Sequence, residues 1–395
     1  MGQTTKPNDR LVRLISGIIY ARENDRPLAC ACLRTAAILY EAAVRVRARY
    51  YLGRRRHPDK LPCRVVSIGN LALGGTGKTP LCIYLAGLIH DAGYRVAIVS
   101  RGYKGQAEKT GALIEPGPLS APAAHRVGDE PALMARLLAP RSIPIFVGRD
   151  RLASGRRALT QFQPDVILLD DGFQHHRLAR DLDIVLLDGG DPLGNGYLLP
   201  RGPLREPPAA LARADILILT RCQRKPGGRL MADAATVLVQ AVPGLKAKPI
   251  FSSRHRPVAR ECLTAGTSAG PRSGRLDLAA LKGLPVLAFA GIARNKAFRE
   301  TVAGLGADIR GWSAFRDHYR YCADDLALLT HAGLKRGVRA LVTTDKDRIR
   351  IRDEWIRELP LMVVGVRMDF HDDTDAFQSL IFEKLHLDAR REMTT

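Results

Sequence analysis

The amino-acid sequence predicts an α/β fold in which a parallel sheet is flanked by helices and is followed by a second, smaller α/β domain. From Cys63 onward, short apolar runs alternate with helical segments, which is the pattern of βαβ units. A glycine-rich turn joins the first of these runs directly to a helix. With 395 residues, the chain exceeds the size at which one hydrophobic core usually stops growing, so two domains are expected.

The expected strands are short and apolar. In the first domain they are Arg64–Ile68, Arg95–Val99, Ile143–Val147, Val166–Leu169, Ile184–Leu187 and Ile216–Leu219. In the second they are Leu284–Ala290, Ala340–Val342 and Leu361–Val366, with helices at Asn295–Leu305 and Ala323–Ala332. Between them, 254–275 crowds Thr, Ser, Gly, Pro and Arg without periodicity, which indicates a linker. The predicted domains are therefore 1–58, 59–250 and 276–395, with the linker at 251–275.

Two amphipathic helices are expected before the first strand. Apolar residues fall at helical spacing over Leu11–Ile19, with arginines around them. A second helix over Leu28–Tyr51 contains Arg34 and Glu41, so it is too polar to span a bilayer. The two helices either pack on the body of the protein or lie in the headgroup region of an anionic membrane. The first residues lack the features of a secretory signal, so no export is expected.

The charge of the chain is strongly positive. Lys and Arg number 61 against 40 Asp and Glu, which gives a net charge of +21 and favours phosphate-rich partners. Nucleic acid, a nucleotide and an anionic membrane surface all satisfy this condition. Aromatic residues make up only 6% and no nucleic-acid-binding motif is recognisable, so nucleic acid is the weakest of these alternatives.

The glycine-rich turn has the features of a phosphate-binding P-loop. It follows an apolar strand, opens a helix and ends in Gly-Lys-Thr. Its predicted nucleotide-binding residues are Ala72, Leu73, Gly74, Gly75, Thr76, Gly77, Lys78 and Thr79. Backbone N–H groups would converge on phosphate oxygens, and Lys78 would reach the β- and γ-phosphates. The strict motif requires Gly at position 72, where this chain has Ala72.

A second apolar run delivers two carboxylates to the end of a strand. Asp170 and Asp171 follow Val166–Leu169, and open α/β sheets bind ligands at such strand ends. With the hydroxyl of Thr79, these carboxylates are the expected ligands of Mg²⁺ in an ATP complex. One of the two aspartates could instead cap the following turn.

A P-loop specifies a nucleotide but not the acceptor of its phosphate. Kinases, GTPases, motors and ligases all use it. The nearest candidate for a guanine-specificity motif, Thr343–Asp347, has the wrong spacing, so ATP is the expected nucleotide. A P-loop ATPase or ligase that acts on a soluble small molecule stays an alternative at this point.

Seven motifs in a fixed order narrow the choice. They are GGTGKTP at Gly74–Pro80, SRGY at Ser100–Tyr103, VGDEP at Val127–Pro131, LLDDGFQH at Leu168–His175, LLPRGPLREP at Leu198–Pro207, FRDHY at Phe315–Tyr319 and VTTDKD at Val342–Asp347. Together they resemble the tetraacyldisaccharide 4'-kinase family of the lipid A pathway of Gram-negative bacteria. The resemblance implies transfer of the γ-phosphate of ATP to the 4'-hydroxyl of a tetraacylated glucosamine disaccharide 1-phosphate. It also implies a peripheral protein, here expected to be a monomer, at the cytoplasmic face of the inner membrane.

The resemblance assigns roles to further residues. It implies that Asp129 and His318 form an acceptor-activating pair, which together with Lys78 makes up the expected catalytic set, and that the smaller domain closes over the site. Taken alone, Asp129 could cap a helix and His318 could be structural. Where the family commonly has a second His, this chain has Tyr319. The expected substrate-binding residues are basic or carried by the motifs: Arg101, Tyr103, Arg149, Arg151, Gln174 and His175.

Overall fold

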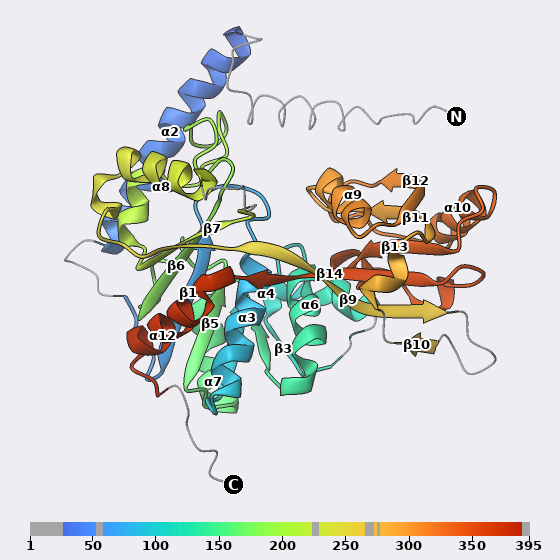
Figure 1. The fold of residues 1–395 in the computed structure, drawn as a ribbon. Coiled ribbons are helices and arrows are strands. Elements are labelled where there is room, and N and C mark those ends of the chain that lie inside the picture. The colour runs from blue at the N-terminus through green and yellow to red at the C-terminus, as the bar shows by residue number, and fades with distance from the viewer. Residues whose placement is uncertain are drawn as a thin grey trace. The chain divides into compact units, whose positions relative to one another are not determined.

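The computed structural model describes residues 27–52, 58–117, 119, 121–222, 229–264, 272–274 and 277–388 (Figure 1). The helix expected at Leu11–Ile19 lies outside these described residues. The helix expected at Leu28–Tyr51 is present as α2 (Pro27–Leu52). None of the helices in the described part of the chain is long and apolar enough to cross a bilayer.

The first sheet has eight strands in the order β3-β4-β2-β5-β1-β6-β7-β8. They are β1 (Arg64–Asn70), β2 (Val96–Ser100), β3 (Ala112–Ile114), β4 (Ile145–Val147), β5 (Val166–Asp170), β6 (Leu182–Asp188), β7 (Ile216–Thr220) and β8 (Ile250–Ser252). The pairs β1–β6, β6–β7, β7–β8 and β2–β4 are parallel, whereas β3 runs antiparallel to β4.

The second sheet has six strands in the order β10-β9-β14-β13-β11-β12. They are β9 (Arg254–Thr264), β10 (Arg272–Gly274), β11 (Pro285–Ala290), β12 (Asp308–Ala314), β13 (Ala340–Thr344) and β14 (Leu361–Asp369). The pairs β11–β12, β11–β13 and β13–β14 are parallel, and β10 is antiparallel to β9.

Helices connect the strands of both sheets. The remaining α-helices are α3 (Lys78–Asp91), α4 (Ala107–Thr110), α5 (Ala121–Val127), α6 (Asp129–Leu138), α7 (Arg151–Gln161), α8 (Arg229–Ala241), α9 (Asn295–Gly304), α10 (Ala323–Leu334), α11 (Asp345–Arg348) and α12 (Thr374–Leu385). Short 3₁₀ helices are η1 (Ala139–Arg141), η2 (Pro208–Arg213), η3 (Pro243–Leu245), η4 (Leu278–Leu281), η5 (Asp353–Trp355) and η6 (His371–Asp373).

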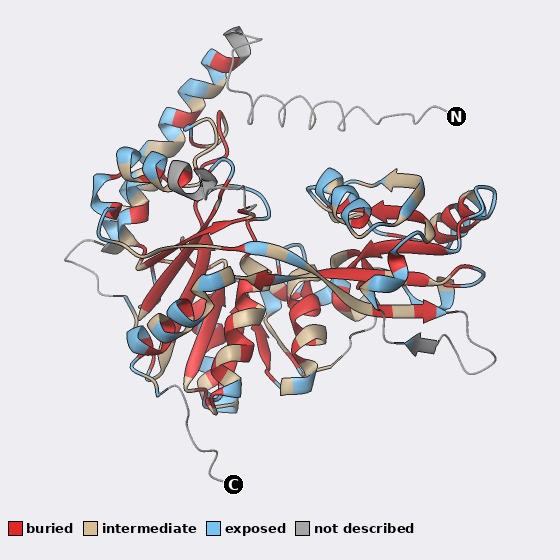
Figure 2. Ribbon diagram, in the orientation of Figure 1, coloured by how far each residue is buried: buried red, intermediate tan, exposed pale blue. Residues whose placement is uncertain are grey.

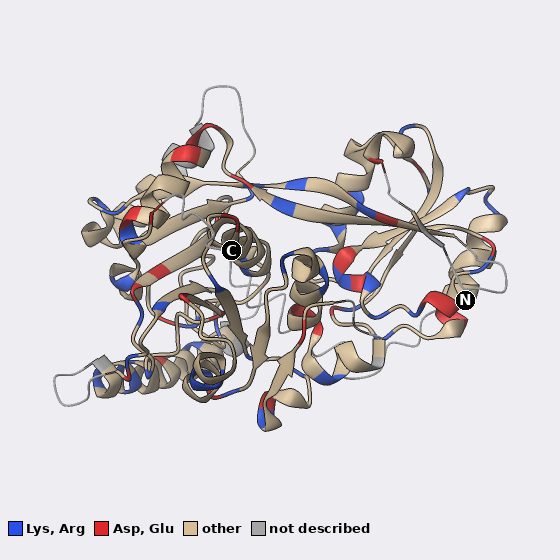
Figure 3. Cartoon of the chain, turned by 90° about the horizontal axis from the view of Figure 1, so that it is seen from below, with Lys and Arg blue, Asp and Glu red and all other residues tan. Residues whose placement is uncertain are grey.

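The chain divides into two compact units. Among the described residues, the first unit takes those up to Lys78, Leu169–Arg254 and those from Phe370 onward. The second unit takes Thr79–Leu168 and His255–Asp369. Basic and acidic residues are interspersed along the elements of both (Figure 3).

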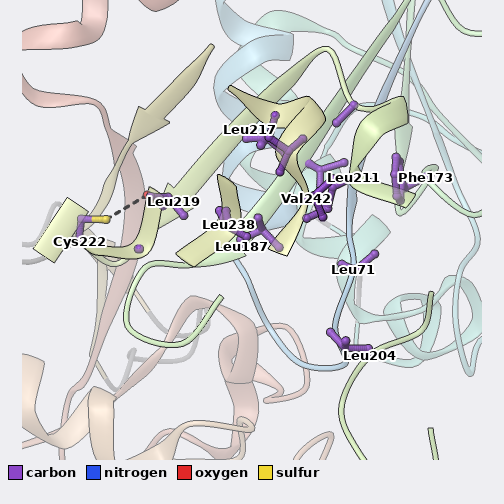
Figure 4. Close-up of a cluster of buried hydrophobic side chains, with 14 of the residues drawn as sticks. Leu71, Phe173, Leu187, Leu204, Leu211, Leu217, Leu219, Cys222, Leu238 and Val242 are labelled. Atoms are coloured by element: carbon purple, nitrogen blue, oxygen red, sulfur yellow. Dashed lines mark hydrogen bonds between the residues drawn. The ribbon is translucent and has the colours of Figure 1, made fainter. Parts of the chain in front are cut away.

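The first unit has a core of buried aliphatic side chains from β6, β7 and α8 (Figure 4). Leu71 and Phe173, both fully buried, belong to this cluster. Leu71 opens the glycine-rich turn, and Phe173 follows Asp170, the last residue of β5, and Asp171. Burying these two side chains contributes roughly 2 kcal/mol each and fixes the loops that carry the polar residues.

In the second unit, clusters of buried side chains lie on each side of the strands β11, β13 and β14. Side chains of α10 and the segment after α11 cover one side, and side chains of α9 cover the other. The inner strands of the sheets, such as β1, β5, β6, β11 and β13, are buried along most of their length, whereas β8, β9 and β12 are mostly half-buried or exposed and the helices expose one side (Figure 2).

The predicted fold class is confirmed, and every expected strand is present with ends that differ by a few residues. Five strands were not predicted: β3, β8, β9, β10 and β12. The most consequential is β9, because the sequence led us to expect no regular structure over 254–275. Strand β9 pairs with β10 and belongs to the second sheet, so this segment is part of a folded domain along much of its length. The domain boundaries themselves stay a prediction.

Candidate active site

The glycine-rich turn joins β1 to α3, as the sequence predicts. Gly74 and Gly77 have φ angles of 109° and 94°, a region that side chains other than hydrogen rarely allow. The side chain of Asn70 holds the turn from below, since its Nδ2 donates to the carbonyl oxygens of Ala72 at 2.6 Å and Gly74 at 3.3 Å. These two hydrogen bonds fix the shape of the turn.

The irregular residue of the motif, Ala72, has a structural explanation. Ala72 forms an antiparallel bridge with Leu204, and the neighbouring Leu73 N–H donates to the carbonyl of Pro203 at 2.7 Å. Ala72 has no positive φ angle, so glycine is not required there. Pairing with the Pro203–Arg205 segment fixes the backbone conformation at position 72, where the strict motif has glycine.

Lys78 lies at the start of α3, against a carboxylate. Its Nζ is 3.4 Å from Asp171 Oδ1, and Arg205 Nη1 donates to both oxygens of Asp171 at 3.1 and 2.9 Å. Burial by itself would raise the pKa of Asp171, but the charges of Lys78 and Arg205 lower it to about 2. The carboxylate is therefore ionised and shared between two cations.

Asp170 and Thr79 are the other residues expected at a metal. Asp170 is buried at the end of β5, and Asp171 follows with a φ angle of 54°, which turns the chain sharply after the strand. Thr79 follows Lys78 in the first turn of α3 and is partly buried.

Gln174 and His175 follow in the turn after β5. Gln174 Nε2 donates to the carbonyl of Asn70 at 2.9 Å, so it is tied to the base of the glycine-rich turn. The carbonyl of His175 accepts from Arg180 Nη1 at 2.9 Å. Helix α2 reaches the same turn, because Arg47 Nη2 lies 3.5 Å from the Gln174 carbonyl.

In the second unit, the SRGY turn packs on the residue that precedes Asp129. Gly102 and Gly128 have φ angles of 69° and 97°. A Cβ on Gly102 would lie 2.6 Å from the carbonyl oxygen of Val127, and one on Gly105 would lie 2.7 Å from the backbone nitrogen of Gly128. Glycines are needed here because two backbones touch. The SRGY and VGDEP motifs are therefore packed directly against each other.

Arg101 and Tyr103 extend from that turn. Arg101 Nε donates to Glu108 Oε1 at 2.6 Å, and its guanidinium lies 5.9 Å from the ring centre of Tyr103. Tyr103 is exposed. Arg149 is exposed, whereas Arg151 is buried at the start of α7 and donates through Nη1 to the Arg149 carbonyl at 3.1 Å.

Asp129 and His318 are in direct contact. Asp129 is the first residue of α6, and its Oδ2 lies 2.7 Å from His318 Nδ1. His318 has a φ angle of 60°, and its backbone N–H donates to the carbonyl of Gly291 at 3.2 Å. Burial alone would raise the pKa of Asp129, but hydrogen bonds and charges from His318 and Arg350 lower it to about 2.

Sequence reasoning did not assign roles to Arg205 and Arg350, each of which binds one of these carboxylates. Arg205 lies within the LLPRGPLREP motif, and this position in a motif was the signal from which a role could have been predicted. Arg350 follows the VTTDKD motif by three residues and contacts Asp129 across 221 positions of sequence. Nothing in its local sequence distinguishes it from the many other arginines.

A strand, a glycine-rich turn and a helix, with a carboxylate pair at the end of the neighbouring strand, are the features of a P-loop nucleotide-binding protein. The second unit separately contains a carboxylate–imidazole pair. The sequence profile of one family, described as Tetraacyldisaccharide-1-P 4'-kinase, matches residues 29–386. The chain belongs to this family, and it is an ATP-dependent kinase.

Individual relatives agree with the family match. A tetraacyldisaccharide 4'-kinase of Syntrophus aciditrophicus is 39% identical over 366 residues, which cover 91% of this chain and 94% of the relative. One of Desulfatibacillum aliphaticivorans is 37% identical with the same coverage. A crystal structure of LpxK from Aquifex aeolicus in complex with ATP matches with a TM-score of 0.65 and 28% identity, over 90% of this chain and 99% of that one.

Proposed function

We propose that this kinase transfers the γ-phosphate of ATP to the 4'-hydroxyl of a tetraacylated glucosamine disaccharide 1-phosphate, the step that forms lipid IVA in lipid A biosynthesis. Family membership supports the reaction. The observation that carries it in the structure is the 2.7 Å contact between Asp129 and His318, because a carboxylate bound to an imidazole is suited to activating an acceptor hydroxyl.

The glycine-rich turn and Lys78 bind the triphosphate. Backbone N–H groups of Gly74–Lys78 and the start of α3 offer donors to phosphate oxygens. Lys78 Nζ lies 3.4 Å from Asp171 Oδ1. The γ-phosphate competes for this cation, while Arg205 keeps the Asp171 carboxylate neutralised and in place.

The residues at the end of β5 fit a magnesium ion. Mg²⁺ takes oxygen ligands and usually binds one or two carboxylates together with nucleotide phosphates. Asp170 is buried at the strand end and Thr79 carries a hydroxyl in the first turn of α3. Asp171 already faces two cations, so Asp170 and Thr79 are the better candidates to hold the ion. When bound, the ion neutralises charge that develops on the transferred phosphoryl group.

Asp129 and His318 activate the acceptor. Asp129 stays ionised at neutral pH, so Nδ1 of His318 carries its hydrogen and donates to Oδ2, which leaves Nε2 as the acceptor nitrogen. A carboxylate with a pKa of about 2 is a weak base. The imidazole therefore takes the hydroxyl proton late in the transfer, and Asp129 stabilises the imidazolium. In this assignment Asp129 does not itself take the proton of the hydroxyl.

The anionic 1-phosphate and the sugar require donors of their own. Arg101, Tyr103 and Arg149 are exposed or partly exposed near the SRGY turn and are suited to this role. Arg151 is buried and supports the Arg149 backbone. Gln174 and His175 lie in the turn after β5, where they shape the part of the site that binds the nucleotide.

Helix α2 is proposed to bind the membrane that holds the substrate. Cys30, Ala37 and Tyr40 face the protein, whereas Leu39 and Val46 on the opposite side are 69% and 66% exposed. Basic residues lie between the exposed apolar ones: Arg34, Arg45, Arg47 and Arg49. An exposed apolar side rimmed by arginine favours an anionic leaflet. We propose a peripheral monomer at the cytoplasmic face of the inner membrane.

Liposome flotation tests the membrane proposal. The protein is expected to float with vesicles of anionic phosphatidylglycerol, and Leu39→Glu together with Val46→Glu is expected to abolish this. Phosphatidylcholine vesicles and a double substitution at two exposed residues of α10, Leu328→Glu and Leu334→Glu, are the controls. Equal flotation of both double variants would contradict the assignment of α2.

Separating nucleotide binding from transfer tests the site. Lys78→Ala is expected to weaken ATP binding and reduce transfer by at least about 100-fold. Asp129→Asn is expected to leave the Kd of ATP within about threefold and reduce kcat by roughly 100- to 10,000-fold. Lys60→Ala, at an exposed lysine, is the control. Transfer at the wild-type rate in Asp129→Asn would overturn the assignment of the pair.

A further inference from the structure

Arg350 binds the same oxygen of Asp129 that His318 binds. Its Nε donates to Asp129 Oδ2 at 2.9 Å and its Nη2 lies 2.8 Å from the same atom. The side chain of Arg350 is 8% exposed and lies in the segment that follows α11. Oδ2 of Asp129 is therefore contacted by an imidazole and a guanidinium together, whereas no described residue hydrogen-bonds its Oδ1.

Arg350 is itself held by a buried carboxylate. Its Nη1 donates to Asp347 Oδ1 and to the carbonyl of Gly291, each at 3.2 Å. Asp347 is completely buried and accepts from the hydroxyl of Thr344 at 2.7 Å and that of Tyr321 at 3.2 Å. Both oxygens of Asp347 also lie 3.1 Å from the backbone nitrogen of Gly291.

Gly291 connects the two partners of Asp129. Its carbonyl oxygen accepts from the backbone N–H of His318 and from Nη1 of Arg350, both at 3.2 Å. A Cβ at this position would lie 3.0 Å from both Asp347 Oδ1 and the hydroxyl of Tyr321, so little more than glycine fits. A movement of Gly291 would shift the imidazole and the guanidinium together.

We propose that Arg350 is a positioning residue of the phosphotransfer reaction, held by Asp347 of the VTTDKD motif, and that it fixes the Asp129 carboxylate so that His318 is the proton acceptor. The inference rests on the proposed function of the Asp129–His318 pair. It gives a role to the VTTDKD motif, to which the function proposed above assigns none. Arg350 acts through Asp129, which it contacts directly.

Loss of Arg350 has two effects on Asp129. The carboxylate loses its fixed orientation, and burial, which opposes the charged form, is no longer offset by the guanidinium. The other charged groups nearby are Asp317, 3.8 Å from His318 Nε2, and the Glu130–Lys346 contact at 3.8 Å. The carboxylate of Asp317 cannot replace the lost cation. Protonation of Asp129 is therefore expected at higher pH.

The test compares Arg350→Met with Arg352→Met in lipid phosphorylation assays over a range of pH. Arg352 is an exposed arginine two residues further on that pairs with Glu354 at 3.3 Å, so its variant controls for the lost charge. Arg350→Met is expected to lower kcat by about 10- to 100-fold, with the KM for ATP within about twofold. The acidic limb of its kcat profile, which reports protonation of the Asp129–His318 pair as a unit, is expected to move to higher pH, because a positive charge next to the pair is removed. Arg352→Met is expected to match the wild type in all three measurements.

A double variant separates a positioning role from a general structural one. Added to Asp129→Asn, Arg350→Met is expected to cost less than about twofold, because there is no carboxylate left to position. Arg350→Lys keeps the charge with fewer donors and is expected to recover part of the rate; it also replaces Arg350→Met if that variant does not fold. Equal kcat values and pH profiles for the Arg350 and Arg352 variants would overturn the inference. Absence of lipid phosphorylation by the wild type would instead overturn the proposed function.

Discussion

Removing the charge of Asp129 is expected to cost stability in a pH-dependent way. The pKa of this carboxyl is about 2 in the folded chain against an ordinary value of 3.8. This difference corresponds to about 2 kcal/mol in favour of the ionised folded state. Because the folded pKa is the lower one, this contribution is fully present above about pH 4 and is lost as the pH falls through about 2.

Urea unfolding of the wild type and Asp129→Asn at several pH values measures this contribution. The variant is expected to be less stable by about 2 kcal/mol at pH 7 and by about 1 kcal/mol at pH 3. Asp308→Asn removes an exposed partner of Arg310 and is expected to change stability by less than about 0.5 kcal/mol at every pH. A difference between the wild type and Asp129→Asn that stays constant from pH 7 to pH 3 would refute the assignment of the Asp129 contacts.

Three further predictions concern the backbone. Ala72→Gly is expected to leave ATP affinity within about twofold and to cost about 0.5–1 kcal/mol of stability, because the residue pairs with Leu204 and needs no positive φ. Isothermal titration measures the affinity and urea unfolding measures the stability. A tenfold gain in affinity would contradict this prediction. Gly102→Ala is expected to destabilise by about 2 kcal/mol or more, since its Cβ would lie 2.3 Å from a methyl of Val147. Gly304→Ala, in the last turn of α9 with open space around it, is expected to stabilise by up to about 1 kcal/mol. A melting temperature that rises for both Gly102→Ala and Gly304→Ala, or falls for both, would contradict the roles given to these two glycines.

The elements that bind phosphate were predictable because their signals are local. The strand, turn and helix around Lys78 lie within one continuous stretch, and the aspartates after β5 directly follow an apolar run. The fold class followed from the same alternation of strands and helices. Strands β3 and β8 have only three residues each, which is too short for a periodic signal.

The long-range partners were not predictable from local pattern. Strand β9 contains Arg, His, Glu and Pro, so its composition is that of a loop, and its place in the second sheet comes from tertiary pairing. Arg205 lies 34 positions from Asp171, and Arg350 lies 221 positions from Asp129. In a chain with 61 basic residues, the choice of these two arginines is made by packing rather than by spacing.

Transfer of label from ATP to lipid tests the central claim most directly. The protein is incubated with γ-labelled ATP, magnesium and tetraacyldisaccharide 1-phosphate in detergent micelles, and the lipids are then separated. Labelled bisphosphorylated lipid is expected with the wild type and not with Lys78→Ala or Asp129→Asn. Label found only in free phosphate, or transferred equally well to a soluble sugar phosphate, would contradict the assignment of a lipid acceptor.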